Sequence, residues 1–163
     1  MSLFSVAIGK EHLRFTAAHF IAFRGFREPL HGHTYHAQVT VSGPMGPDGY
    51  VVDFLVLKNI AEAECARLHF RTLLPRQSDC LLIEEGADEV TVRCEDGSQF
   101  LFPRQDVCFL PIVHTSSEEI AQYLVARLRE GLRGVRGSIQ TIEVLIEDVP
   151  GQIATCREDF QPA

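Results

Sequence analysis

The segment HFIAFRGFREPLHGHTYHAQV, from His19 to Val39, contains four of the seven histidines of the chain. Two of them, His31 and His33, flank a single glycine, and residues 33–42 alternate and are rich in β-branched side chains, which predicts a strand. Side chains two residues apart on a strand share a face, so an extended backbone here would present both imidazoles side by side. The segment therefore predicts both a strand and a candidate site at its beginning.

A third histidine lies at the end of the strand predicted before this one. That strand covers residues 12–20 and ends near His19, and it would pair antiparallel with the later strand after a loop over residues 20–30. Three neutral imidazoles without a fourth protein ligand are typical of a catalytic zinc site, which keeps one position open. Spacing alone leaves the alternative open that these are ordinary core or surface histidines. His36 and His114 fit that ordinary role better.

Further from the histidines, the pattern of elements predicts an α+β fold. Asp53 is expected to cap a helix, and Ser116 with Glu119 has the spacing of a capping box before a second apolar stripe. The element order β-β-β-α-(β)-α-β-β predicts an antiparallel sheet with two helices on one face, in a single domain of residues 1–163. The remaining predicted strands are residues 3–8, 80–85, 89–95, 99–103, 138–148 and 151–158.

Composition excludes several classes of function. The formal net charge of −7 argues against sequence-independent binding to nucleic acid or to an anionic membrane surface. No run of 18 apolar residues predicts a membrane span, and the first ten residues lack the pattern of a secretory signal. The five cysteines are scattered and form no Cys-x-x-Cys pair, which predicts free thiols in a reducing cytoplasm.

Five collinear motifs resemble one known family. FTAAHF (residues 15–20), HGHTY (31–35) and VVDFLVLK (51–58) are similar to the F-x-A-A-H, H-G-H-x-[YF] and V-x-D-F-x-x-L-K motifs of the 6-pyruvoyl-tetrahydropterin synthase and 6-carboxytetrahydropterin synthase family. SSEEIA (116–121) resembles the start of that family's second helix, and EVLIED (143–148) resembles its V-x-V-x-E strand.

This resemblance implies a fold, a cofactor and an assembly. The fold is a T-fold, a four-stranded antiparallel sheet with two helices on one face, and residues 75–110 are a β-rich insertion relative to short family members. The partner is a small pterin substrate, and the assembly is a homo-oligomer, typically a hexamer. The residues implied are zinc ligands His19, His31 and His33, the pterin anchor Glu147, and Ser116 and Ser117 as substrate-binding residues.

The catalytic positions depart from the family pattern. The family's catalytic cysteine lies four residues before H-G-H, where this chain has Arg27, and a guanidinium cannot act as a thiolate does. The family's Asp-His pair matches His69 and Phe70 in LHFRTLL, although a shift of one residue would place His69 at the histidine position. This puts the namesake synthase reaction in doubt.

Glu28 is the candidate replacement for the cysteine. It lies three residues before His31, and E-x-x-H-G-H resembles a family subgroup that cleaves dihydroneopterin to 6-hydroxymethyl-dihydropterin. In that reaction Glu28 would be the general base beside a zinc ion and His69 a proton shuttle. The alternative is that Glu28 has no catalytic role and is a solvated carboxylate of the loop.

Three hypotheses follow from these residues. The first is a zinc-dependent lyase acting on 7,8-dihydroneopterin or its phosphate. The second is a synthase that acts on dihydroneopterin triphosphate with Glu28 in place of the cysteine. The third is a catalytically inactive homologue that binds zinc and a pterin.

Overall fold

The long strand β5 (His31–Pro44) is the centre of a seven-stranded sheet. On one side it pairs antiparallel with β2 (Arg14–His19) along its first half and with β1 (Leu3–Ile8) along its second half. On the other side it pairs with β11 (Thr141–Val149), which in turn pairs with β12 (Gln152–Asp159). The antiparallel pairing predicted for these strands is confirmed, and β5 begins at His31, so both histidines of His-Gly-His lie in extended backbone.

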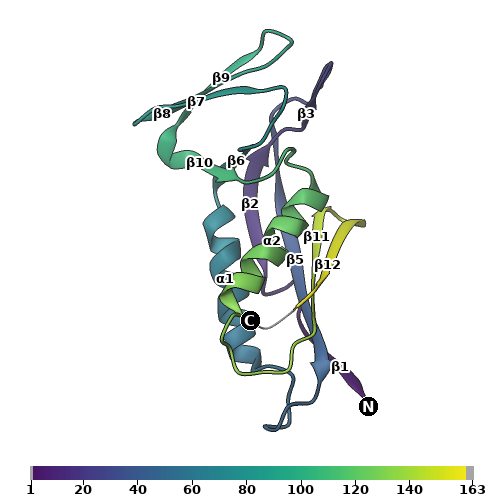
Figure 1. Cartoon of the computed structure of the whole chain (residues 1–163). Coiled ribbons are helices and arrows are strands. Elements are labelled where there is room, and N and C mark those ends of the chain that lie inside the picture. The colour runs from purple at the N-terminus through teal and green to yellow at the C-terminus, as the bar shows by residue number, and fades with distance from the viewer. Residues whose placement is uncertain (1, 161–163) are drawn as a thin grey trace.

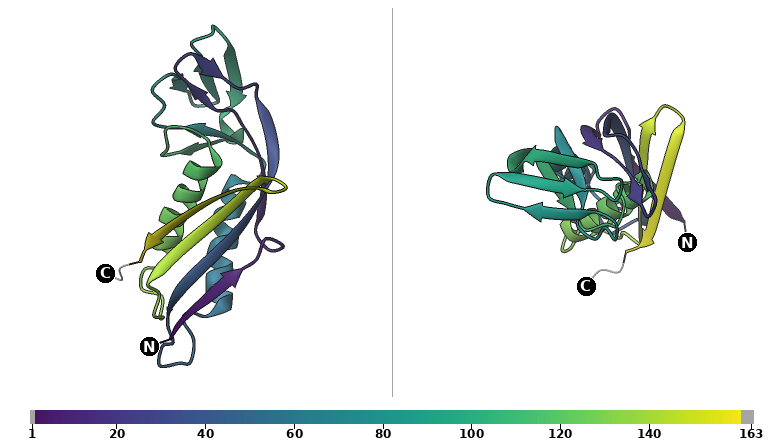
Figure 2. Two further views of the ribbon diagram at one scale, coloured as in Figure 1. Left: turned by 90° about the vertical axis from the view of Figure 1, so that its right-hand side faces the viewer. Right: turned by 90° about the horizontal axis from the view of Figure 1, so that it is seen from above.

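Two helices cover one face of this sheet in the computed structural model, which describes residues 2–160 (Figures 1 and 2). α1 (Phe54–Leu68) is capped by Asp53, whose carboxylate accepts hydrogen bonds from two backbone N–H groups of the first turn. α2 (Ser117–Gly131) is capped by Ser116 as the sequence predicts. The α+β prediction is therefore confirmed.

The core lies between the helices and alternate residues of the strands, because successive side chains of a strand point to opposite faces. On β5 the buried side chains are Tyr35, Ala37, Val39 and Val41. The helices contribute to the same core Leu57, Ala61, Cys65, Leu68, Ile120, Ala121, Leu124, Val125 and Leu128.

The sheet is larger than the four strands that the resemblance implies. β6 (Arg71–Pro75) adds to β2 in parallel, and β10 (Val107–Leu110) adds in parallel to β6. Leu73 and Leu74 are both buried, in two different apolar clusters, so β6 is covered on both faces. A strand of this kind lacks alternation, which explains why the sequence pattern did not predict it.

The insertion is β-rich, as predicted. β7 (Leu82–Glu85), β8 (Glu89–Arg93) and β9 (Gln99–Pro103) form a three-stranded antiparallel sheet at one end of the molecule (Figure 1). It continues through a short 3₁₀ turn (Arg104–Asp106) into β10. The insertion packs against the rest of the chain through a second small core, formed by Phe20, Ala22, Leu74, Val90, Val92 and Val107.

The same end of the molecule carries a short hairpin within the 20–30 loop. It consists of β3 (Ala22–Phe23) and β4 (Phe26–Arg27), which the sequence pattern did not predict because each strand has only two residues. Among the described residues, no helix has the length and apolar character needed to cross a membrane.

Candidate metal centre and active site

The pairing of β2 with β5 brings the three predicted ligands together. His19 lies directly opposite His31, and Ala17 lies opposite His33, so the three imidazoles project from one face of the strand pair. The ring centroid of His19 lies 4.6 Å from that of His31 and 5.3 Å from that of His33, and one nitrogen of each ring lies within 4.8 Å of the others. The predicted convergence of His19, His31 and His33 is confirmed.

Backbone carbonyl groups set which ring nitrogen is available. Nδ1 of His19 lies 2.8 Å from the Thr115 carbonyl oxygen, and Nδ1 of His31 lies 2.8 Å from the Pro29 carbonyl oxygen. Because a carbonyl only accepts, each Nδ1 carries the hydrogen and each Nε2 keeps its lone pair. Nε2 of His19 is buried and has no hydrogen-bond partner among the described residues.

This donor set fits a metal ion. Burial is the main cause that lowers the pKa of His19, so its imidazole is neutral and able to coordinate. Coordination of a metal ion would explain why this buried nitrogen has no hydrogen-bond partner while it faces two further imidazoles. Histidines that bind metals commonly donate their other ring N–H to a carbonyl group, as His19 and His31 do. Three imidazole nitrogens are a donor set that catalytic zinc sites use.

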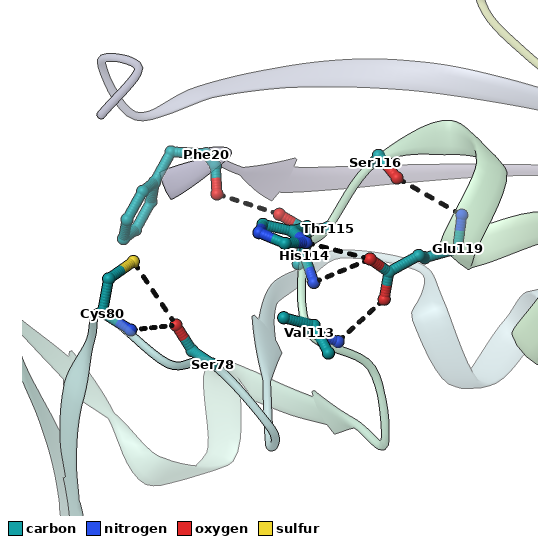
Figure 3. Close-up of polar contacts among 8 residues, drawn as sticks. All are labelled: Phe20, Ser78, Cys80, Val113, His114, Thr115, Ser116 and Glu119. Atoms are coloured by element: carbon teal, nitrogen blue, oxygen red, sulfur yellow. Dashed lines mark hydrogen bonds and ion pairs between the residues drawn. The ribbon is translucent and has the colours of Figure 1, made fainter. Parts of the chain in front are cut away.

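The start of α2 is fixed against His19. The Thr115 hydroxyl donates to the Phe20 carbonyl oxygen over 2.9 Å, next to the ligand in the chain (Figure 3). The Glu119 carboxylate accepts hydrogen bonds from the backbone N–H groups of Val113 and His114, which closes the turn before the helix. His114 also contacts Glu119 through its ring, so it has a structural role here, as expected.

The predicted serines lie beside this turn. The Ser116 hydroxyl accepts from the Glu119 backbone N–H as the helix cap, and the Ser117 hydroxyl donates to the Asp148 carboxylate over 2.9 Å. Both serines and Asp148 line a shallow hollow of about 210 Å³ together with Ile21. Ile21 lies two residues after His19 in the sequence, and a substrate role for the serines stays a prediction.

Glu28 lies next to the histidine centre. Its backbone N–H donates to the Ile21 carbonyl oxygen, and its carboxylate accepts from the Ile21 backbone N–H over 3.0 Å, two residues after His19. The negative charge of Glu28 raises the pKa of His19 against the larger effect of burial. The carboxylate is half-buried and is held by the backbone, which differs from the solvated loop carboxylate of the alternative reading.

Tyr35 and Asp148 are two residues near the centre that the sequence argument did not select. The Tyr35 hydroxyl is buried without a partner among the described residues, and its ring packs against His19 and His33. Burial, with the charges of Asp148 and Glu28, raises the pKa of Tyr35, so the group stays a protonated donor. The strand alternation after His33 is the signal that places Tyr35 on the ligand face.

His69 is not brought to the histidine centre within one chain. It lies at the C-terminus of α1, exposed, with Nδ1 accepting from the Thr16 backbone N–H over 3.0 Å. Its ring contacts that of Phe70 in a tilted arrangement, and Phe70 has a positive φ of 55° and is 76% exposed. The role of His69 as a proton shuttle stays a prediction.

Glu147 lies on the other face of the sheet. It pairs across the strands with His36, which points away from Tyr35 and the ligand face. The Gly151 backbone N–H and the Lys10 ammonium, 2.9 Å and 2.7 Å from its two oxygens, hold the pKa of Glu147 below its ordinary range. These two contacts do not test its predicted role as pterin anchor, which stays a prediction.

Comparison with known proteins agrees with this architecture. A structure of a Plasmodium vivax 6-pyruvoyltetrahydropterin synthase, a catalytic-residue mutant with alanine in place of a glutamate, matches with a TM-score of 0.91 and 35% identity and covers 98% of this chain and 99% of that chain. Residues 8–159 match the family model described as 6-pyruvoyl tetrahydropterin synthase, and the chain belongs to that family. The family resemblance of the sequence motifs is thus confirmed.

Two relatives of this chain are named for different enzyme activities. A provisionally named 6-carboxy-5,6,7,8-tetrahydropterin synthase of Methanocaldococcus jannaschii is 30% identical over 148 residues, which is 90% of each chain. A dihydroneopterin monophosphate aldolase of Pyrococcus furiosus is 41% identical over 59 residues, which is 36% of this chain and 50% of that one.

Proposed function

We propose that the chain is a zinc-dependent enzyme that cleaves the side chain of 7,8-dihydroneopterin, or of its phosphate, to give 6-hydroxymethyl-7,8-dihydropterin. The observation that carries the proposal is the Glu28 carboxylate, which is held by the backbone N–H of Ile21, two residues after His19, one of three converging imidazoles. The glutamate described as catalytic in the Plasmodium vivax relative supports this assignment, as does the aldolase name of the Pyrococcus furiosus relative.

The residues have distinct roles in this reaction. His19, His31 and His33 would hold a zinc ion, which as a Lewis acid makes substrate hydroxyls more acidic. Glu28 accepts the proton of the hydroxyl on the second side-chain carbon. The bond between the first two side-chain carbons breaks, its electron pair passes into the ring C=N group, and glycolaldehyde leaves. Glu28 then returns its proton to the first side-chain carbon.

The protein surroundings orient the substrate. Glu147, Ser116 and Ser117 are the proposed substrate-binding residues, and a carboxylate such as Glu147 can accept two hydrogen bonds from a pterin amino group and ring N–H. Tyr35 stays protonated and is available as a donor near the ligands. His69 is kept as a candidate proton carrier.

A product assay tests the proposal. Zinc-loaded protein is incubated with 7,8-dihydroneopterin, its monophosphate and its triphosphate, with and without a chelator. Chelator-sensitive 6-hydroxymethyl-7,8-dihydropterin with an equal amount of a two-carbon aldehyde supports the lyase. Tight pterin binding without turnover of any of the three would identify an inactive homologue and overturn the enzymatic proposal.

The second candidate function is a synthase reaction on dihydroneopterin triphosphate. The name of the Methanocaldococcus jannaschii relative favours it, because that relative covers most of this chain. Release of inorganic triphosphate with a pterin product other than 6-hydroxymethyl-7,8-dihydropterin is the outcome that would favour this reaction over the lyase.

We also propose a homo-oligomer, a hexamer by family resemblance, in a reducing cytoplasm. β1, β10 and β12 each pair with a single strand of the main sheet as described over residues 2–160, and an unpaired strand edge is a template for pairing with another chain. All five cysteines are free thiols, which suits a reducing compartment. Light scattering on the purified protein measures the oligomeric state directly.

A further inference from the structure

The hairpin that carries Glu28 is joined to the insertion by a set of polar contacts. The backbone N–H of Gly25 donates to the Glu95 carboxylate over 2.9 Å. Nε of Arg27 donates to the Asp96 carboxylate over 2.9 Å, and Nη2 of Arg27 donates to the Ser98 hydroxyl over 3.0 Å. These partners lie in the turn between β8 and β9, at the end of the molecule where β3 also lies (Figure 1).

Arg27 joins this turn to the candidate base itself. Its third contact runs from Nη1 to the backbone carbonyl oxygen of Glu28 over 2.8 Å. Its side chain is 20% exposed, and the guanidinium lies 5.4 Å from the centre of the Phe100 ring on β9. A guanidinium is planar and rigid, so three donors with three fixed partners hold the Glu28 carbonyl at a set position relative to the insertion.

The Asp96 carboxylate, which accepts from Arg27, is itself held in place. The Ser98 backbone N–H donates to the other carboxylate oxygen of Asp96 over 2.9 Å. That hydrogen bond and the Arg27 guanidinium hold the pKa of Asp96 below its ordinary range, so Asp96 is ionised at neutral pH. The turn between β8 and β9 therefore presents a preformed anion to Arg27.

The other end of the Glu28 segment is attached to the insertion by apolar contacts. The Phe20 ring, next to the ligand His19, stacks on Phe100 with the centroids 5.0 Å apart. Phe20 is buried among Val90, Val92 and further residues of the second core. The inserted sheet thus contacts the chain directly after a metal ligand and again at Glu28.

We propose that Arg27 is a positioning residue and that the inserted sheet braces the Glu28 carboxylate beside the three histidines. This inference rests on the proposed function for the role of Glu28. It gives the residue at the family's cysteine position a task that needs no proton transfer from the guanidinium. It also assigns a purpose to the insertion, whose turn supplies Asp96 and Ser98.

Kinetics of four variants test the brace. In zinc-loaded protein with 7,8-dihydroneopterin, Arg27→Gln is expected to lower kcat by about 10- to 100-fold, since a small misplacement of a catalytic group costs this much. KM should stay within about twofold, because Glu28 transfers a proton during the reaction and does not contribute to ground-state binding. Asp96→Asn should lower kcat less, and Arg27→Lys should recover part of the loss.

Two controls separate positioning from general damage. Arg93→Gln removes an arginine of β8 whose guanidinium pairs with Glu84 within the insertion, and it should leave kcat unchanged. The absorption spectrum of bound Co²⁺ should be the same in Arg27→Gln and in wild-type protein. An unchanged kcat in Arg27→Gln, or a loss of Co²⁺ binding equal to the loss of kcat, would overturn the proposal.

Hydrogen exchange decides the brace separately from the activity. The amide of Glu28 is bonded to the Ile21 carbonyl oxygen, so its exchange reports the order of the segment. In Arg27→Gln, the amide hydrogens of peptides from residues 20–30 should exchange about tenfold faster than in wild-type protein. In Arg93→Gln their exchange rate should not change. Equal exchange rates in Arg27→Gln and wild-type protein would overturn the proposed brace even if the enzyme is active. Absence of turnover by the wild-type protein would overturn the proposed function and leave the brace standing.

Discussion

The Nδ1 nitrogen of His19 lies 2.8 Å from the backbone carbonyl oxygen of Thr115. This contact joins the end of β2 to the turn that begins α2, two segments separated by 96 residues in the sequence. It fixes the tautomer of the imidazole and directs Nε2 toward His31 and His33. The geometry of the metal centre therefore depends on packing between the sheet and α2 as well as on the two strands.

The first prediction concerns metal binding. His33→Ala should lose bound zinc. Loss of a group that only orients a metal ligand typically lowers metal affinity by about 10- to 100-fold, and loss of the ligand itself should lower it by more. His36→Ala is the matched control, because His36 lies on the same strand but on the opposite face. Metal content after dialysis, measured by mass spectrometry, distinguishes them; equal zinc in both variants would contradict the assignment.

The sequence predicted this centre because it depends on strand periodicity. His31 and His33 share a face by alternation, and the loop length predicted that β2 would return to β5. The contacts of Thr115 and Arg27 could not be predicted, because they join segments far apart in the chain through packing of α2 and of the insertion. Strand β6 was missed for a local reason: it is buried on both faces and shows no alternation.

The second prediction concerns the contact between the two helices. Arg127 on α2 donates from Nε and Nη2 to both carboxylate oxygens of Glu64 on α1, over 3.0 Å and 3.1 Å. Arg127→Met leaves the Glu64 carboxylate, which is mostly buried, without this partner. We expect a loss of about 1–2 kcal/mol in the free energy of unfolding, at the low end because Arg127 is partly solvated.

Thermal unfolding checks this value. In a chain of this size a loss of about 1–2 kcal/mol lowers Tm by about 2–8 °C. Arg133→Met is the control, because Arg133 pairs with Glu130 in an exposed contact, and its Tm should change little. A Tm of Arg127→Met equal to that of the control would show that the helix pair does not depend on this contact.

The third prediction concerns Glu147. Glu147→Gln should raise KM for 7,8-dihydroneopterin by about 10- to 100-fold, the cost of losing a hydrogen bond to a charged group, with a smaller change in kcat. Glu143→Gln changes a residue on the same strand and face and serves as the control. A KM unchanged by Glu147→Gln would exclude Glu147 as the pterin anchor.

The fourth prediction concerns the pH dependence of the Lys10–Glu147 contact. Since the pKa of Glu147 is below its unfolded value of 4.5, the stabilisation is fully present above that pH and is lost as pH falls through the lowered pKa. Lys10→Met should therefore reduce stability at pH 7 and lose its effect in strong acid. Denaturant unfolding across this pH range measures the difference; an equal effect at both ends would contradict it.

The fifth prediction concerns the cysteines. Burial in α1 raises the pKa of the Cys65 thiol to about 12, and the thiolate is the reactive form. Iodoacetamide at pH 8 should therefore label the half-exposed Cys80 well before Cys65 in native protein, and both alike in urea. Peptide mass spectrometry gives the order, and early labelling of Cys65 in native protein would contradict its burial.

The most direct test of the central claim is the rate at which zinc-loaded protein converts 7,8-dihydroneopterin, or its phosphate, to 6-hydroxymethyl-7,8-dihydropterin, in wild-type protein and in Glu28→Gln. We expect one equivalent each of product and two-carbon aldehyde, and a rate about 10²- to 10⁴-fold lower in the variant, because the general base is lost. An undiminished rate in Glu28→Gln, or no cleavage by the zinc-loaded wild-type protein, would contradict it.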